Sequence, residues 1–524
     1  MSAQKPIPQS LHNATDTDLP EGWCHASLGT VAELVSGAGF PLDRQGRQGL
    51  AYPFFKVGNL GNVESGQELK EAPDTVDSAT AQELRARIIP PRSVLFAKIG
   101  MAIGLNRRRL NGVACCIDNN MMAAIPNKAA LSRYLLRFLE TLSFMELASA
   151  TTVPSLRKSE LVQVGVPLAP LAEQKRIVAK VEELLTQVNA ARDRLAKVPK
   201  ILKRFRQSVL AAACSGRLTE DWRTASVKYQ PSGLLERVLT ACEGRWNLVN
   251  EKRKAAPHPT RAEPAWKRKY GLQEGIDGEF PEPPLGWAWV PLGMLGNDPL
   301  HTVQTGPFGA QLHRNEFTET GVPVVAVGNL TGMGFTRDGL YFITPQKAKQ
   351  LAKYDLQAGD VLFARSGATL GKVCVAPSFV RDWRMTGHIL RARFDFEFLL
   401  PEYAVYALHG DPTVIAQVMG NIRGVTRPGF NTNLLEVVRL QLPPIDEQHE
   451  IVRRVEALFK LADAIEKRVE AATKRADKLT QAILAKAFRG ELVPTEAELA
   501  RRAGHTYEPA SALLERIRRQ IPRS

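Results

Sequence analysis

An internal repeat is the feature that most constrains the fold of this chain. The stretch VLFAKIG at 94–100 returns as VLFARSG at 361–367, with five of seven positions identical. A longer stretch, PLAEQKRIVAKVEELLTQVNA at 170–190, matches PIDEQHEIVRRVEALFKLADA at 444–464 at nine of 21 positions. Two further pairs, GWCHASLG with GWAWVPLG and YPFFKVGNL with VPVVAVGNL, keep the same order. An ordered series of segments that occurs twice predicts two copies of one structural unit.

Each copy ends in a pattern typical of a long helix. Apolar residues alternate in steps of four and three from 177 to 212 and again from 451 to 483. Such a narrow stripe indicates coiled-coil pairing, and two stripes in one chain favour burial against each other. If the two helices run antiparallel, a pseudo-two-fold axis relates the two halves of the chain. Gly216 and Gly490 are expected to end the helices, and Pro199 to kink or split the first one. The expected packing residues are Ile177, Val181, Leu184, Val188, Leu195, Leu202, Ile451, Val455, Leu458, Ile465, Val469, Leu479 and Ile483.

The region in front of each helix predicts a globular domain. Short strand-like runs alternate there with Gly, Pro and Asn turn signals and a few helical segments, which is typical of a mixed α/β (α+β) unit. The predicted fold therefore has two such domains, two long helices and a pseudo-two-fold internal repeat. Its parts are a flexible N-terminal tail (1–20), a first domain (21–168), a central helical region (169–218), a basic connector (219–284), a second domain (285–441) and a C-terminal helical region (442–524).

Charge favours a nucleic-acid partner. The net charge is +15, and 186–270 alone holds 19 Lys and Arg against 7 Asp and Glu. A solvated basic linker explains that segment equally well. Glycine-containing loops elsewhere carry residue types that hold phosphates or read base edges, although for each residue alone a solvated surface position is the simpler interpretation. The candidate DNA-binding residues are Lys98, Arg107, Arg108, Arg109, Arg365, Ser366, Thr369, Lys372, Arg423, Arg427 and Asn431.

Motifs for catalysis or metal binding are not found in the sequence. There is no GxSxG, HExxH or phosphate-binding GxxxxGK[ST] motif, and GATLGK at 367–372 is one residue short of the last. The six cysteines form no CxxC pair, so we expect reduced thiols, no metal site and a cytoplasmic protein. No apolar run approaches the ~18 residues of a membrane helix, and no membrane association is expected. The chain is not expected to be an enzyme by itself.

The repeated motifs carry a resemblance to a known family. Three motifs occur in both copies and in the same order: VGNL, VLFAKIG or VLFARSG, and the helix starts PLAEQ or PIDEQ. The second copy also contains TGPFGAQL at 305–312 and RSGATLGK at 365–372. In this the chain resembles the specificity subunit of a type I restriction–modification system. The first copy departs from the pattern, because GAGFPLDRQGRQGL at 37–50 aligns poorly with TGPFGAQLH and KIGMAIG with RSGATLGK.

The resemblance implies a non-catalytic, sequence-specific DNA-binding subunit. The domains at 21–168 and 285–441 become target recognition domains, each reading one half of a bipartite site on double-stranded DNA, and the antiparallel helices hold the spacing. Two methyltransferase subunits, with S-adenosylmethionine bound to them and not to this chain, would methylate adenine. Motor-nuclease subunits would complete the restriction complex.

Three alternatives remain, a coiled-coil scaffold, a single-chain DNA-binding regulator without a methyltransferase partner, and a self-contained restriction enzyme. The last would require a nuclease or methyltransferase motif, which is not found in the sequence. The target sequence depends on loop geometry, water and DNA shape, for which the chain carries no motif.

Overall fold

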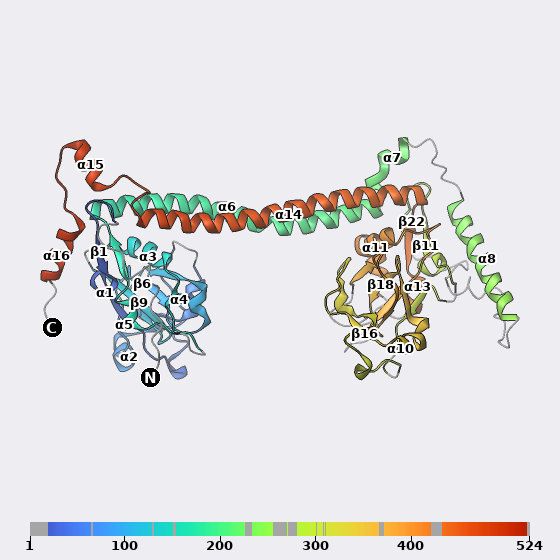
Figure 1. The fold of residues 1–524 in the computed structure, drawn as a ribbon, viewed down its shortest axis with the longest axis horizontal. Helices are drawn as coiled ribbons and strands as arrows, with labels where there is room; N and C mark the ends of the chain where they lie inside the picture. The colour runs from blue at the N-terminus through green and yellow to red at the C-terminus, as the bar shows by residue number, and fades with distance from the viewer. Residues whose placement is uncertain are drawn as a thin grey trace. The chain divides into compact units, whose positions relative to one another are not determined.

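The chain forms two compact units, each of which is described by itself. The computed structural model describes residues 19–63, 67–127, 130–149, 153–225, 233–254, 270, 280–299, 301–307, 309, 311–365, 371–420 and 432–520. Unit 1 comprises Met1–Ala196 and Val469–Ser524, and unit 2 comprises Lys197–Arg468 (Figure 1). Each unit therefore combines a globular domain with one part of each long helix.

Unit 1 contains a five-stranded sheet with a buried central strand. The strand order is β2 (Ala32–Ser36), β9 (Met121–Pro126), β6 (Val94–Ala97), β7 (Arg108–Asn111) and β4 (Glu68–Leu69). A second sheet has the order β5 (Thr75–Val76), β3 (Tyr52–Phe55) and β8 (Cys116–Ile117), and β1 (Cys24–Ser27) pairs with β10 (Gly165–Leu168). All four residues of β6, the repeated VLFA, are buried, because neighbouring strands and both faces of the sheet cover them.

Unit 2 repeats this topology. Its first sheet has the order β12 (Val303–Thr305), β21 (Ile389–Ala392), β18 (Val361–Ala364) and β19 (Val373–Val375). Its second has the order β16 (Tyr341–Ile343), β13 (Val322–Val325), β20 (Arg381–Met385) and β17 (Asp355–Gln357). β11 (Ala288–Pro291) pairs with β22 (Arg439–Leu442), and β14 (Leu330–Thr331) with β15 (Gly334–Phe335). β18 takes the place of β6, so the mixed α/β class and the internal repeat are confirmed.

Short helices cover the sheets. Unit 1 has α1 (Leu28–Val31), α2 (Ser78–Glu83), α3 (Ser132–Thr141), α4 (Phe144–Leu147) and α5 (Lys158–Leu161). Unit 2 has α10 (Pro345–Gln350), α11 (Pro401–Gly410), α12 (Pro412–Gly420) and α13 (Thr432–Val437). In unit 1, α3 lies between the five-stranded sheet and the long helices (Figure 1), where the rings of Tyr134 and Phe138 pack against Phe488.

The long helices α6 (Leu171–Cys214) and α14 (Ile445–Phe488) each have 44 residues and run antiparallel. In unit 1 the Arg192 guanidinium lies 2.7 Å from an Asp477 carboxylate oxygen, and in unit 2 Arg206 lies 2.6 Å from Asp463. Rising numbers on α6 thus meet falling numbers on α14, as expected. The expected split at Pro199 is wrong, because α6 continues through it. Proline has no N–H, so the helix lacks one backbone hydrogen bond at Pro199. This is one bond among many in a long helix, and the next residue of the apolar stripe, Leu202, is buried.

The predicted packing residues are buried or half-buried at every position except one. Leu479 is 51% exposed, so its assignment to the packing stripe is wrong. The next residue along the helix, Thr480, is half-buried instead of Leu479. The stripe of buried and half-buried residues therefore runs from Ala476 through Thr480 to Ile483. The buried predicted residues are Ile177, Val181, Val188, Leu202, Ile451, Val455 and Ile483, and the half-buried ones are Leu184, Leu195, Leu458, Ile465 and Val469.

Each long helix begins with a buried Glu-Gln pair that anchors a globular domain. Glu173 accepts a hydrogen bond from the Trp23 indole at 2.9 Å, and Glu447 accepts one from Trp287 at 2.8 Å. The repeated GW and EQ motifs, far apart in the sequence, therefore meet in both units. Since all these groups are buried, the contacts fix each domain to its helix.

The segment after each long helix packs into the unit that contains the end of that helix. After α6 come α7 (Glu220–Ala225) and α8 (Leu234–Lys254), and α8 buries Trp246 in the core of unit 2. After α14 come α15 (Glu496–Ala503) and α16 (Ala510–Gln520), and α16 buries Leu513 in the core of unit 1. Gly216 and Gly490 end the helices with φ of +73° each, the left-handed conformation expected of a glycine cap. No helix among the described residues is long and apolar enough to cross a membrane.

Candidate nucleic-acid interface

The candidate interface lies where the central strand of each domain ends. Lys98 follows β6, and its backbone N–H donates to the Asn120 carbonyl at 2.8 Å. Arg365 follows β18 and donates in the same way to the His388 carbonyl at 2.9 Å. The two basic residues therefore occupy equivalent positions in the two units, although they are far apart in the sequence.

The loop after β18 is closed at its base. The Ala364 N–H donates a hydrogen bond to the Lys372 carbonyl at 3.0 Å. This bond places the Lys372 backbone beside the end of β18, where Arg365 follows. Both side chains are half-buried, and His388 beside them is exposed. Ser366 and Thr369 in this loop, and Arg423, Arg427 and Asn431, lie outside the described residues. The structure thus brings together two of the seven candidates predicted for the second domain.

A glycine next to each strand end explains part of the sequence pattern. A Cβ atom on Gly37 would lie 1.9 Å from the Asp118 carbonyl oxygen, and one on Gly306 would lie 2.1 Å from that of Thr386. No other residue fits at either place. The stretches that begin with these glycines, which align poorly as sequences, therefore occupy equivalent positions. Their spacing from the VGNL motif, nearly the same in both copies, could have revealed this equivalence.

The two strand ends differ in charge. In unit 1, burial raises the pKa of Asp118, while the positive charges of Lys56 and Lys98 oppose that rise. Lys56 itself is bound to Asp74, with 2.8 Å between its ammonium nitrogen and a carboxylate oxygen. In unit 2 the place of Asp118 is taken by Thr386, which carries no charge. The surface near Arg365 is therefore better suited to phosphate than the surface near Lys98.

The arginine triplet of the first domain does not form one basic loop. Arg107 is exposed, but Arg108 is 1% exposed, its guanidinium stacks 3.9 Å from the centre of the Phe144 ring, and it donates to the Leu142 carbonyl at 2.7 Å. Burial lowers the pKa of Arg108 to about 10. Its assignment as a DNA-binding residue is wrong, because it belongs to β7 and faces the core. Arg109 is half-buried and donates to the Val63 carbonyl at 3.2 Å, so its guanidinium also supports a neighbouring loop.

The repeated VGNL motif has a structural role. The Asn59 side chain accepts a hydrogen bond from the Lys56 N–H at 2.7 Å, and Asn329 accepts one from the Ala326 N–H at 2.9 Å. Both asparagines are buried and hold the turn that follows β3 or β13. The repeated asparagine therefore stabilises the same turn in both domains.

The described residues offer no arrangement for metal chemistry. Among them, no three His, Cys, Asp or Glu side chains are grouped so that they could hold an ion. All six cysteines are free and buried. Burial raises the pKa of the Cys115 thiol to about 12 and that of Cys116 to about 11, so these thiols stay protonated and unreactive at neutral pH.

Comparison with known proteins assigns the repeat to a family. The family model described as "Type I restriction modification DNA specificity domain" matches residues 20–200 and 309–475. The chain is 25% identical over 491 residues to the type I restriction enzyme EcoKI specificity subunit of Escherichia coli strain K12, covering 90% of each protein. It is 24% identical over 498 residues to the StySPI specificity subunit of Salmonella potsdam, again covering 90% of each.

Solved structures share the fold. A chain from a study of complex assembly and conformational transition of the type I R-M system is 20% identical, with a TM-score of 0.61 over 90% of this chain and 99% of that one. The HsdS subunit from Thermoanaerobacter tengcongensis is 19% identical, with a TM-score of 0.51 over 90% of this chain and 98% of that one.

Proposed function

Because the chain belongs to the family of type I restriction–modification DNA specificity proteins, we propose that it directs adenine methylation, and restriction, to a bipartite DNA sequence. The observation that carries the proposal is the equivalence of the two strand ends. Each unit presents one basic residue, Lys98 or Arg365, at the same point of the same topology. Two similar readers in one chain suit a split site on duplex DNA, whose backbone has local two-fold symmetry.

The domains at 21–168 and 285–441 are proposed as the two target recognition domains. Phosphate contacts from the loop-base residues Arg365 and Lys372 would position the second domain, and loop side chains would read base edges. The difference in charge between the two strand ends supports different half-sites for the two domains. Both long helices contribute to both units, so we propose that their length determines the spacer between the half-sites.

The chemistry is proposed to belong to partner subunits. Two methyltransferase subunits would bind S-adenosylmethionine and modify adenine, motor-nuclease subunits would complete the restriction complex, and this chain would bind no cofactor. The assembly would act in the cytoplasm, where chromosomal DNA is exposed. The names of the relatives, which are specificity subunits of restriction enzymes, support this division of labour.

A domain exchange tests the proposal. The 285–441 segment is replaced by the corresponding segment of a relative, and the chain is assembled with its methyltransferase partner and S-adenosylmethionine. Mapping of methylated adenines should then show one altered half-site and one unaltered half-site. A change in both half-sites, or methylation that no longer depends on sequence, would contradict independent readers. The chain without partners serves as the control and should transfer no methyl groups.

A further inference from the structure

Two equivalent positions at the ends of the long helices differ greatly in size. Phe488 lies two residues before the glycine that ends α14, and its ring packs against Tyr134 at 5.0 Å and Phe138 at 5.5 Å between ring centres. In unit 2 the corresponding residue, two before the glycine that ends α6, is Cys214. The residue that corresponds to Phe138, four positions after a buried tyrosine, is Ala407. Unit 2 therefore lacks both phenyl rings that fill this region of unit 1.

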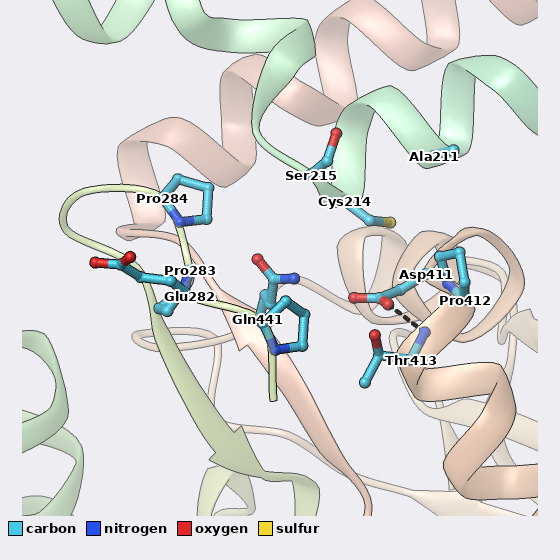
Figure 2. A pocket seen from close by; sticks show the side chains of 11 residues that line it. Ala211, Cys214, Ser215, Glu282, Pro283, Pro284, Asp411, Pro412, Thr413 and Gln441 are labelled. Atoms are coloured by element: carbon cyan, nitrogen blue, oxygen red, sulfur yellow. Dashed lines mark hydrogen bonds between the residues drawn. The ribbon is translucent and has the colours of Figure 1, made fainter. Parts of the chain in front are cut away.

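A pocket of about 450 Å³ lies in this part of unit 2. Its wall includes Cys214, four prolines of which Pro284 is one, and the polar residues Asp411 and Gln441 (Figure 2). Glu282 and Pro412 are exposed, so the pocket opens to the surface. A small-molecule site usually encloses most of its ligand, whereas an open pocket of this size suits a side chain presented by another protein.

Two buried oxygen atoms in the wall have no hydrogen-bond donor. Asp411 is 3% exposed, and its Oδ1 atom accepts hydrogen bonds from the N–H groups of Thr413 at 2.8 Å and Val414 at 3.3 Å. Its Oδ2 atom has no partner among the described residues, and neither does Oε1 of Gln441, a residue that is 8% exposed. Figure 2 shows both side chains at the hollow, with Gln441 coming from β22 and Asp411 from the residue before α12. Buried acceptors are rarely left unsatisfied, so the site requires a donor.

The charge of the pocket identifies the kind of donor. None of its lining residues is basic, and the acidic residues Asp411 and Glu282 both contribute to it, although the whole chain has a net charge of +15. A guanidinium group is planar, is always charged and carries several N–H donors, so it can reach two oxygen atoms at once. The apolar rings of the prolines can pack against the aliphatic part of an arginine side chain.

We propose that this pocket of unit 2 binds an arginine side chain of a protein partner. The guanidinium would donate hydrogen bonds to Asp411 Oδ2 and Gln441 Oε1, and the Glu282 carboxylate at the rim would attract it. Unit 1 would have no such site, because the large side chain of Phe488 stands there in place of the pocket residue Cys214. The inference is independent of the proposed DNA recognition, since it rests on the pocket alone.

The first test measures binding of acetyl-arginine amide to the full-length chain by ligand-observed NMR. We expect binding that weakens at least tenfold for the neutral analogue acetyl-citrulline amide and for D411N. In D411N the side chain keeps an oxygen that can accept the hydrogen bonds from Thr413 and Val414 at the start of α12 and loses only its charge, so we expect the fold to be retained. E319Q, which neutralises an exposed carboxylate elsewhere in unit 2, is the matched control and should bind as the wild type does. Equal binding by D411N and wild type would overturn the proposal.

The second test identifies the source of the arginine. A photo-crosslinking amino acid replaces Thr413 in the full chain, the assembled complex is isolated, and cross-linked peptides are mapped. A partner-subunit segment that contains arginine is expected, and its yield should fall in C214F, where a phenyl ring fills the pocket as Phe488 does in unit 1. Cross-links only to segments without a basic residue, or an unchanged yield in C214F, would refute the docking of a partner arginine. Adenine methylation measured on the same complex shows separately whether the proposed function holds.

Discussion

The two buried glutamates at the helix starts should respond differently to the same substitution. Glu447 accepts hydrogen bonds from Trp287 at 2.8 Å and from the Thr219 hydroxyl at 2.6 Å, and it also forms an ion pair with Arg223. Glu173 accepts from Trp23 at 2.9 Å and from the Glu496 N–H at 2.8 Å. Replacement by glutamine keeps the shape of each side chain and removes its charge.

The expected losses follow from these partners. In E447Q the amide keeps one acceptor for the indole, and the Thr219 hydroxyl can rotate to accept, but the ion pair is broken. Breaking a buried pair typically costs 3–5 kcal/mol, and we take about 3 kcal/mol because Arg223 retains its bond to the Gly216 carbonyl. In E173Q one backbone bond is lost, which is about 1–2 kcal/mol.

Desolvation reduces the second loss further. Burial raises the pKa of Glu173, so its charged form is already disfavoured and a neutral side chain removes that penalty. We therefore expect about 1 kcal/mol for E173Q. The difference of about 2 kcal/mol corresponds to roughly thirtyfold in an opening equilibrium.

Hydrogen exchange at neutral pH measures this difference unit by unit. Amides of β11 and β22 in E447Q should lose about thirtyfold more protection, relative to wild type, than amides of β1 and β10 in E173Q. The unmutated unit of each variant is the internal control and should be unchanged. Equal losses, or a larger loss in E173Q, would refute the assignment of the ion pair as the main difference between the anchors.

Three further predictions concern binding, acid stability and packing. R365A should weaken DNA binding by the assembled complex about equally for all DNA sequences, and the slope of log affinity against log salt should fall by about 1 in fluorescence anisotropy titrations. The buried Arg108 contributes no contact, so R108M, though less stable, should bind as before; equal weakening would contradict the core position of Arg108. Hydrogen bonds from Arg453 and Arg454 lower the pKa of Glu450 to about 2 from 4.5, so the stabilisation by its charged form is present above pH 4.5 and is lost as the pH falls toward 2. The Tm of the wild type should therefore fall more steeply than that of E450Q over this window. Parallel Tm curves would contradict a stabilising role of the Glu450 charge. F488A should lower the free energy of unfolding of unit 1 by about 3–5 kcal/mol in denaturant titrations, far more than C214A should lower that of unit 2. Similar losses would contradict the conclusion that the Phe488 ring fills space in unit 1 that the Cys214 side chain does not fill in unit 2.

The features that depend on local pattern could be predicted from the sequence. The order of repeated motifs predicted two units with one topology, and the four-three spacing predicted two long helices packed against each other. Their antiparallel direction was implied by the family resemblance. The error at Leu479 arose because the buried stripe shifts by one residue there, to the polar Thr480. The apolar pattern of the sequence does not show this shift, which depends on how the helix packs. The helix also continues through Pro199, which the proline rule applied to the sequence did not predict.

The features that depend on three-dimensional contacts could not be predicted. Arg108 looks like a loop cation in the sequence, but its place on β7 directs it toward Phe144. The pairing of Trp23 with Glu173 joins residues from two matched motifs whose partnership no spacing rule indicates. The pocket beside Cys214 is lined by residues from separate parts of the chain, and no local pattern in the sequence brings them together.

The division of the chain into units has a consequence for the gene. Unit 1 is made of the beginning and the end of the polypeptide, while unit 2 is the uninterrupted segment Lys197–Arg468. An in-frame deletion of that segment would leave every residue of unit 1, but would fuse the first half of α6 directly to the second half of α14. One straight helix of this kind cannot fold back on itself. Two copies of the shortened product would have to exchange helices to rebuild the antiparallel pair, so a gene of half the length would encode a homodimer with two identical heads.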